Sequence, residues 1–250
     1  MPMRVLQLWR YPVKSMAGER LDESAVDDLG LPGDRWWGVV DLETGKVLTA
    51  KREARLLHAR ARLVSDDEVE VELPDGRLLT SDDQLSAWLG RRVSLQRAGE
   101  SGGHFENPRD FESETDWVDW QGPPRAWHDV RRARVSVVST GSLGLWDVRR
   151  FRPNVLVDGD GEGALVGRSV RLGTAILSVT TLIERCVVIT REQPGITKDL
   201  DVLRQVNREH DGLLAVGALV ETPGFVTVGG QLLVAEQSPN GDRPAAAAGA

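Results

Sequence analysis

The chain has little of several features that would point to particular classes of protein. Among its 250 residues there is one cysteine, which excludes both an intrachain disulfide and a metal site built from paired cysteines. No apolar run approaches the roughly 20 residues that span a bilayer, and the first 15 residues do not resemble a signal peptide. A formal net charge of −7 argues against binding to nucleic-acid phosphates. We therefore expect a soluble cytoplasmic protein that binds neither membrane nor nucleic acid.

Two common kinds of ligand site also lack their sequence motifs. Neither G-x-x-x-x-G-K-[ST] nor a G-x-G-x-x-G following a predicted strand occurs, so the standard nucleotide-binding folds are not indicated. The histidines are scattered without the spacing of zinc ligands or of a catalytic triad; they are His58, His104, His128 and His210.

Short strand-like runs dominate what is present. Residues 36–41 and 47–49 flank a Gly-containing turn, and residues 69–73 and 77–79 flank a Pro-Asp-Gly turn, so each pair predicts a hairpin. Helices are expected to be few: one after Ser81, one capped by Ser139 and Thr140, and one over residues 199–208. This pattern predicts a mainly β fold with a few helices (α+β), arranged as two β-barrel-like lobes.

Residues 99–134 interrupt the strand pattern. A connection of this length without regular structure is unusual inside a compact domain. Its aromatic residues indicate that it packs on the lobes, and they are Phe105, Phe111, Trp117, Trp120 and Trp127. We therefore expect a first lobe at 1–98, a packed connecting loop at 99–134, a second lobe at 135–236 and a disordered tail at 237–250.

Cys186 lies in the apolar run 182–189, and two interpretations are open. A cysteine in such a run is commonly a buried structural thiol. Alternatively, the positive charge of Arg185 favours the thiolate, which is the form that binds metals. Neighbouring side chains on an extended strand point to opposite faces, so the second interpretation requires a local twist or bulge.

Basic residues recur in four short clusters flanked by turns, at residues 11–15, 33–35, 49–52 and 151–154. Each cluster could be an ordinary solvated loop. Lys and Arg beside hydroxyl and amide groups are equally suited to a phosphate and a polar heterocycle.

Taken together, these segments resemble the MOSC-domain family. The match includes the N-terminal β-barrel domain that precedes MOSC in the amidoxime-reducing proteins of mitochondria and in bacterial reductases of N-hydroxylated compounds. The first part of the resemblance runs through residues 11–15, 33–37 and 49–53. The second runs through residues 138–143, 150–155, 185–186 and 223–224. The resemblance implies a MOSC N-terminal β-barrel followed by a MOSC barrel, and it favours the ligand interpretation of Cys186.

The resemblance implies a molybdenum cofactor, a Mo-pyranopterin, with Cys186 as the metal ligand and catalytic residue. A soft thiolate suits a thiophilic metal. Family positions that hold the pterin and its phosphate correspond to Lys14, Ser15, Arg35, Arg152, Asn154 and Arg185. Weaker correspondences in matching segments are Arg52, Ser139 and Thr140.

The activity that the resemblance implies is reduction of N-hydroxylated or otherwise N-oxygenated small molecules by an oxidoreductase whose cofactor supplies the redox chemistry. Two departures occur: Ile183 replaces a second cysteine of the amidoxime reducers, and the cysteines of an attached ferredoxin-like domain are absent. The electrons are then expected from a separate donor protein of ferredoxin, flavodoxin or cytochrome type. Carboxylates of residues 104–121 are candidate general acids.

Two alternatives to a reductase remain at this point. One is a molybdenum cofactor or sulfur carrier that uses an exposed Cys186 without redox turnover. The other is a barrel that keeps the fold but binds a different anionic small molecule.

Overall fold

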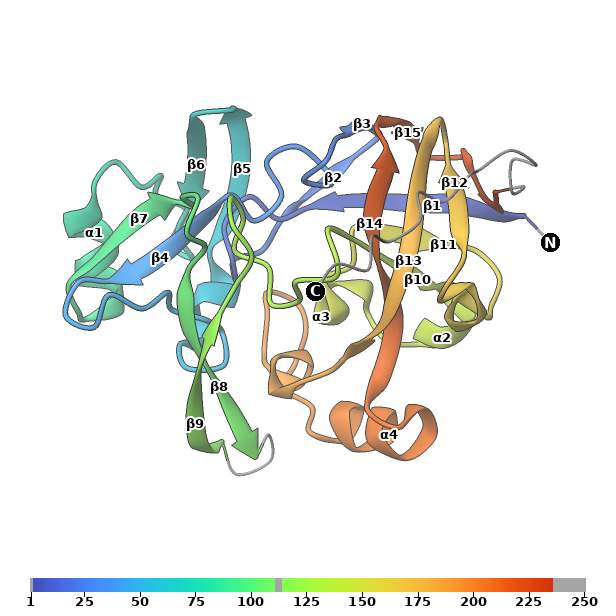
Figure 1. The fold of residues 1–250 in the computed structure, drawn as a ribbon. Helices are drawn as coiled ribbons and strands as arrows, with labels where there is room; N and C mark the ends of the chain where they lie inside the picture. The colour runs from blue at the N-terminus through green and yellow to red at the C-terminus, as the bar shows by residue number, and fades with distance from the viewer. Residues whose placement is uncertain (1, 111–113, 236–250) are drawn as a thin grey trace, which may run out of the picture.

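The computed structural model describes residues 2–110 and 114–235, which form two lobes side by side (Figure 1). The tail expected at 237–250 lies outside the described residues. No helix in the described ranges is long and apolar enough to cross a membrane.

Seven strands close into a barrel that makes up the larger lobe, which confirms the mainly β fold. In order around the ring they are β11 (Val155–Val157), β10 (Val135–Ser139), β14 (Leu213–Thr222), β13 (Ala175–Glu184), β12 (Ser169–Leu172), β16 (Gln231–Val234) and β1 (Met3–Arg10). The ring closes because β1 pairs with β16 on one side and with β11 on the other. Its interior is filled by fully buried aliphatic side chains such as Leu8, Leu177 and Val216, as the alternation of a small barrel requires.

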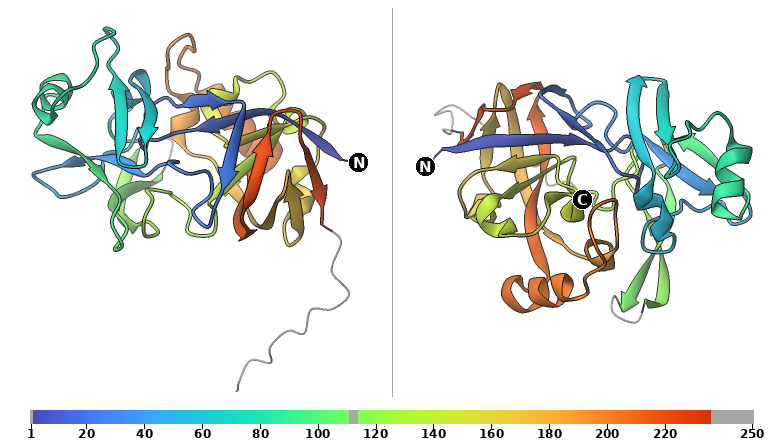
Figure 2. Two further views of the ribbon diagram at one scale, coloured as in Figure 1. Left: turned by 90° about the horizontal axis from the view of Figure 1, so that it is seen from above. Right: turned by 180° about the vertical axis from the view of Figure 1, so that it is seen from behind.

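The N-terminal strands belong to this second-lobe barrel. In β1, Leu8 lies opposite Val155 of β11, and β2 (Glu19–Leu21) extends the sheet beyond β1. Next along the chain, β3 (Glu23–Val26) pairs with β15 (Gly224–Thr227). Figure 2 shows from two sides that the blue N-terminal strand lies among the yellow and red strands. The segment between β1 and β2 therefore passes close to the junction of the lobes.

The first lobe is built from short two-stranded sheets around its own apolar core. Within it, β4 (Trp37–Asp41) pairs with β7 (Val93–Arg97), and β5 (Arg60–Ser65) pairs with β6 (Glu68–Glu72). A 3-10 helix, η1 (Ala54–His58), and α1 (Asp82–Leu89) pack against them. As predicted, the Ser81 side chain caps α1, and Gly90 ends it in the left-handed conformation.

Both predicted hairpins form, although each is short. In the first, the N–H of Asp41 donates to the carbonyl of Lys46 at 2.9 Å and that of Leu48 donates to Val39 at 2.8 Å. In the second, the N–H of Leu73 donates to the carbonyl of Arg77 at 2.9 Å and that of Leu79 donates to Val71 at 2.8 Å. Val40 and Val47 form one bridge, and Glu72 and Leu78 form the other. The N–H of Val47 donates to the carbonyl of His104 at 2.7 Å, so a later segment adds to the first hairpin.

Residues 99–134 contain regular structure that their composition does not predict. Strands β8 (His104–Asp110) and β9 (Thr115–Gln121) form an antiparallel hairpin that projects beside the lobes (Figure 1). Phe105 and Trp127 are buried against Val40 and Val47. The expected packing of this segment is therefore present, whereas the expected irregular chain is replaced in part by a hairpin whose residues are mostly exposed.

Short helices cover one side of the barrel. They are α2 (Thr140–Leu143), α3 (Val148–Phe151), η2 (Glu162–Leu165), η3 (Val187–Thr190) and α4 (Asp201–His210). Helix α4 starts two residues later than predicted and buries Val202, Leu203 and Val206 in a cluster that also contains Ile189, which follows Cys186 in the chain. This packing fixes the position of the chain around Cys186.

Candidate functional site

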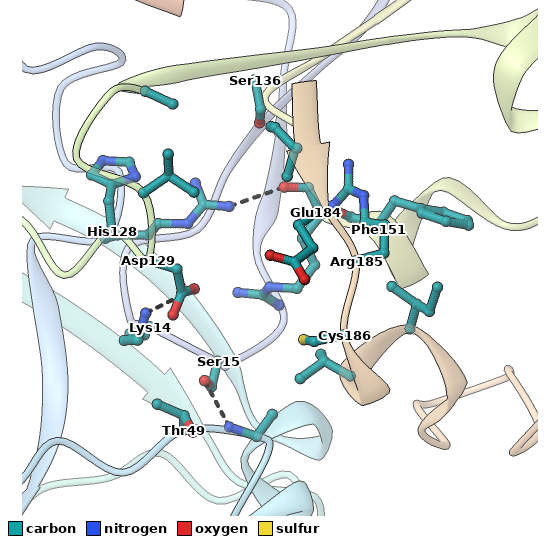
Figure 3. Close-up of a pocket in the computed structure, with 18 of the residues that line it drawn as sticks. Lys14, Ser15, Thr49, His128, Asp129, Ser136, Phe151, Glu184, Arg185 and Cys186 are labelled. Atoms are coloured by element: carbon teal, nitrogen blue, oxygen red, sulfur yellow. Dashed lines mark hydrogen bonds and ion pairs between the residues drawn. The ribbon is translucent and has the colours of Figure 1, made fainter. Parts of the chain in front are cut away.

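A cavity of about 640 Å³ contains most of the predicted site residues. Its lining comes from both lobes: residues 14–15, 35 and 49–51 from the first part of the chain, Asn107 and Trp120 from the β8–β9 hairpin, and residues from within 128–136, 150–154 and 183–189. Figure 3 shows Lys14, Ser15 and Thr49 on one side of this space and Arg185 and Cys186 on the other.

Cys186 is presented to the cavity by the end of a strand. Strand β13 ends at Glu184, and its register with β14 shifts between Leu182 and Glu184. Cys186 is extended, with φ −125°, and immediately precedes η3. The irregularity allows both Arg185 and Cys186 to line the cavity. The thiol is half-buried and free.

Arg185 and Arg152 each have a buried guanidinium nitrogen without a partner in the described part of the chain. Arg185 donates through Nε to the carbonyl of Leu214 at 2.7 Å and through Nη1 to that of Phe151 at 2.9 Å. Arg152 donates through Nη1 to the carbonyl of Met16 at 2.6 Å. Nη2 of both side chains is buried with no hydrogen-bond partner among the described residues. Each can therefore still donate to an anion in the cavity.

Burial lowers the pKa of both arginines to about 10, because the interior disfavours the charged form. The largest effect that raises these pKa values again is the interaction with Tyr11 for Arg152 and with Cys186 for Arg185. The guanidinium of Arg152 also lies 4.3 Å from the centre of the Tyr11 ring. Both side chains remain cationic at neutral pH.

Two buried lysines share one carboxylate at the opposite side of the cavity. Lys14 Nζ lies 3.1 Å from Asp129 and donates to the carbonyl of Trp127 at 2.7 Å. Lys51 lies 3.5 Å from Asp129 and also contacts the amide oxygen of Asn107. This arrangement places two positive charges around a single negative one.

The pKa values reflect that arrangement. Burial lowers the pKa of Lys14 to about 8, more than Asp129 can offset. Burial acts in the same direction on Lys51, but Asp129 and Cys186 together raise its pKa. Although burial alone would raise the pKa of Asp129, the two lysines hold it well below its usual range.

Three cavity residues have left-handed backbone conformations that non-glycine residues rarely adopt: Ser15 at φ 69°, Arg35 at φ 56° and Arg152 at φ 53°. Hydrogen bonds hold Arg35 in place, since its N–H donates to the carbonyl of Tyr11 and its carbonyl accepts from Trp127, both at 2.7 Å. Such conformations gather at ligand sites, where the surrounding structure imposes them.

Of the ten predicted site residues, seven line the cavity: Lys14, Ser15, Arg35, Arg152, Asn154, Arg185 and Cys186. Asn154 also holds backbone, because its side-chain oxygen accepts from the N–H of Ser136 at 3.0 Å and its nitrogen donates to Trp9 at 3.3 Å. The hydroxyl oxygen of Ser15 accepts from the N–H of Ala50 at 2.9 Å.

The other three predicted residues are not among those that line the cavity. Arg52 lies 3.5 Å above the ring of Trp117 and pairs with Glu106 at 3.1 Å. Ser139 caps α2 and donates to buried Glu162 at 2.6 Å. Thr140 donates to the carbonyl of Gly159 at 3.2 Å. In this structure their side chains make contacts that stabilise the fold.

Several lining residues were missed by the sequence reasoning. Lys51 lies within the basic cluster at 49–52 and Arg150 directly precedes the cluster at 151–154, so their charge was the available signal. Residues 128–136 were missed because they fall mostly in the stretch interpreted as a connection. The carboxylates that line the cavity are Asp129 and Glu184, whereas no described carboxylate of residues 104–121 does so.

Two family models match most of the chain. Residues 2–117 match the MOSC N-terminal beta barrel domain, and residues 122–232 match the MOSC domain. Proteins named molybdenum cofactor sulfurase from Drosophila grimshawi and Drosophila mojavensis are 25% and 24% identical to it over 87% of this chain. The chain spans 32% of the length of each of these relatives.

Among solved structures, the YuaD protein from Bacillus subtilis aligns with 93% of this chain and 94% of its own, with 14% identity and a TM-score of 0.46. YiiM from Geobacillus stearothermophilus aligns with 56% of this chain and 75% of its own, with 16% identity and a TM-score of 0.35. The family matches along the sequence, which together extend over both lobes, show that the chain belongs to the MOSC-domain family, with a MOSC N-terminal β-barrel domain followed by a MOSC domain.

Proposed function

We propose that the cavity binds a Mo-pyranopterin cofactor through Cys186 and that the protein reduces N-hydroxylated or N-oxygenated small molecules. The observation that carries this proposal is the charge around the only cysteine. The lining contains two carboxylates and nine cationic side chains, which are Lys14, Arg35, Lys51, Arg131, Arg132, Arg134, Arg150, Arg152 and Arg185. In a chain of net charge −7, such a concentration of positive charge indicates an anionic ligand.

The residues present fit this cofactor. The free Nη2 atoms of Arg152 and Arg185 supply donors for a phosphate or for pterin acceptors. A half-buried thiol in a cationic cavity is suited to act as a thiolate ligand. When bound, the cofactor supplies two-electron redox chemistry, while the protein binds and orients it. Similarity to proteins named molybdenum cofactor sulfurase also supports a function connected with this cofactor.

A reductase fits the position of Cys186 better than a carrier does. The thiol lies inside a cavity of about 640 Å³, a size typical of small-molecule sites. A carrier must bring its sulfur or cofactor to a partner protein. The carrier, with Cys186 as the attachment point, is the second candidate, because the sulfurase-named relatives favour it. Electrons for the reductase would come from a separate donor protein.

The test is to purify the protein from a host that makes the cofactor and to measure molybdenum and oxidised pterin. Stoichiometric molybdenum that is absent from Cys186→Ala, together with reduction of an N-hydroxylated amidine by reduced viologen, is expected. Loaded protein that shows no turnover but transfers cofactor or sulfur to an acceptor would favour the carrier. Absence of molybdenum and pterin, in a host shown to load a related protein, would contradict both.

A further inference from the structure

The segment 128–134 forms one side of the cavity and carries positive charge that is not neutralised locally. Arg131, Arg132 and Arg134 all line the cavity. Among the ion pairs of the described residues, none involves any of these three side chains. All of them lie outside the set that the family resemblance connects with the cofactor.

Within residues 2–110 and 114–235, the hydrogen bonds of these side chains go to backbone carbonyls. Arg131 donates through Nε and Nη2 to the carbonyl of Gln121 at 3.1 and 3.0 Å. Arg132 donates to the carbonyl of Thr180 at 3.0 Å, and Arg134 donates to that of Pro124 at 3.3 Å. Nη1 of Arg134 is buried and has no partner in the described parts of the chain. These contacts orient the guanidinium groups and leave donors available for a ligand.

An aromatic surface lies beside these arginines. Trp120 of β9 lines the same cavity, is 38% exposed, and lies with its ring centre 5.8 Å from the guanidinium carbon of Arg131. His128, at 7% exposure, has Nε2 buried without a partner. An exposed indole offers a flat apolar contact to a planar ring.

The three arginines make no hydrogen bond or ion pair, within the described residues, to the side chains grouped around Cys186. Figure 3 shows His128 and Asp129 on the side of the cavity opposite Arg185 and Cys186. Asp129 pairs with Lys14 of the proposed cofactor group, but a cofactor held by Arg152, Arg185 and Cys186 would leave Arg131, Arg132, Arg134 and Trp120 available to a second molecule.

We propose that this surface is a substrate subsite for an aromatic molecule that carries a carboxylate or a phosphate. Arg131, Arg132 and Arg134 bind the anionic group, and Trp120 contacts the ring. The assignment of this molecule as the substrate depends on the proposed reductase function, whereas its binding does not. The natural substrate is then an N-oxygenated aromatic anion.

Binding is tested first, by calorimetry on the protein purified from the cofactor-producing host. Benzoate and phenyl phosphate are expected to bind, and benzyl alcohol is expected to bind much more weakly. Loss of charged hydrogen bonds in Arg131→Gln/Arg134→Gln should weaken anion binding roughly 10-fold or more. Arg171→Gln is the matched control, because Arg171 is exposed on β12 and outside the cavity. The ratio of the affinities for benzoate and phenyl phosphate distinguishes a carboxylate ligand from a phosphate ligand.

Two further variants locate the bound anion. Trp120→Leu should weaken benzoate but leave inorganic phosphate unchanged, since only benzoate has a ring. Arg134→Lys should restore part of the affinity that Arg134→Gln loses. If binding instead depends on Arg152 and is unchanged in Arg131→Gln/Arg134→Gln, the anion lies in the group around Cys186 and the proposal is overturned.

Turnover is tested with reduced viologen, so that docking of a donor protein plays no part. An N-hydroxylated benzamidine with a para carboxylate should have a kcat/KM roughly 10-fold or more above that of the uncharged compound, and the arginine double variant should remove the difference. Equal kcat/KM values for the charged and uncharged compounds would overturn the proposal. So would an arginine double variant that changes only the rate with an acidic donor protein. Binding without any turnover would contradict the reductase and leave the anion subsite supported.

Discussion

Replacing Arg152 by glutamine separates the contribution of this side chain to ligand binding from its contribution to folding. The guanidinium has one free buried nitrogen, so a bound anion gains a charged hydrogen bond that the variant cannot make. Loss of a buried charged partner typically costs about 2–5 kcal/mol of binding, which is roughly 30- to 4,000-fold in affinity. We therefore expect Arg152→Gln to lose most of its molybdenum during purification.

The stability of the cofactor-free protein should change little. Burial lowers the pKa of Arg152 from 12.5 to about 10, which corresponds to a cost of about 3 kcal/mol for holding the charge in the fold. Because folded and unfolded chains are both charged below pH 10, this cost is fully present at neutral pH and is lost only as pH rises past 10. Glutamine removes the cost but also loses the bond to Met16, about 1.5–3 kcal/mol, and the Tyr11 contact, about 1–2 kcal/mol.

Arg150→Gln provides the matched control. Arg150 is equally a cavity arginine, at 7% exposure, but it donates to the carbonyls of Ile189, Arg191 and Thr197. Its loss should destabilise the fold by about 3 kcal/mol or more, because charged hydrogen bonds and their carbonyl acceptors are left unpaired. Urea unfolding of both cofactor-free variants measures the difference. The reasoning is refuted if Arg152→Gln is destabilised as much as Arg150→Gln or retains molybdenum as the unaltered protein does.

Three further outcomes follow from the same structure. Cys186→Ala should lose molybdenum while its urea midpoint stays nearly unchanged, since the thiol makes no capping bond to η3; retained metal would show that the ligand is another residue. Since burial lowers the pKa of Lys14 from 10.5 to about 8, the unfolded chain binds more protons between these values, so stability of the cofactor-free protein should rise with pH there. Lys14→Met should lack that rise in urea titrations at stepped pH, and an identical rise would exclude Lys14 as its source. Asp34→Asn should lower the free energy of unfolding by about 3–5 kcal/mol and the melting temperature by roughly 10 °C. The reason is that Asp34 is fully buried, accepts from the N–H of Tyr11 and pairs with Arg35. Calorimetry showing an unchanged melting temperature would contradict this role.

Local sequence signals predicted the elements that depend on local chemistry. Ser81 and Gly90 define the ends of α1 because capping involves only neighbouring residues. The hairpin at residues 104–121 was not predicted, since its strands are mostly exposed and their partner is set by pairing rather than by an apolar alternation. The pairing of β1 with β11 and β16 depends on residues more than 140 positions away, which no local pattern encodes.

The site shows the same division between local and long-range information. The family resemblance selected Lys14, Arg35 and Arg152 from the basic clusters, and the fold brings them to one cavity. Ser139 has the residue type of a ligand-binding position, but its buried partner Glu162 becomes visible only in three dimensions. Asp129 was missed because its significance depends on two lysines that are 78 and 115 positions distant in the chain.

The place of β1 in the barrel has a consequence for synthesis on the ribosome. Strand β2 pairs with the end of β1 soon after it is made, but the two neighbours of β1 in the barrel ring begin at Val155 and Gln231. The rest of β1 therefore stays without its final partners while the intervening residues are translated, and such unpaired edges are prone to pair with other chains. The N-terminal strand is the part of the nascent chain that we expect to depend most on chaperone protection.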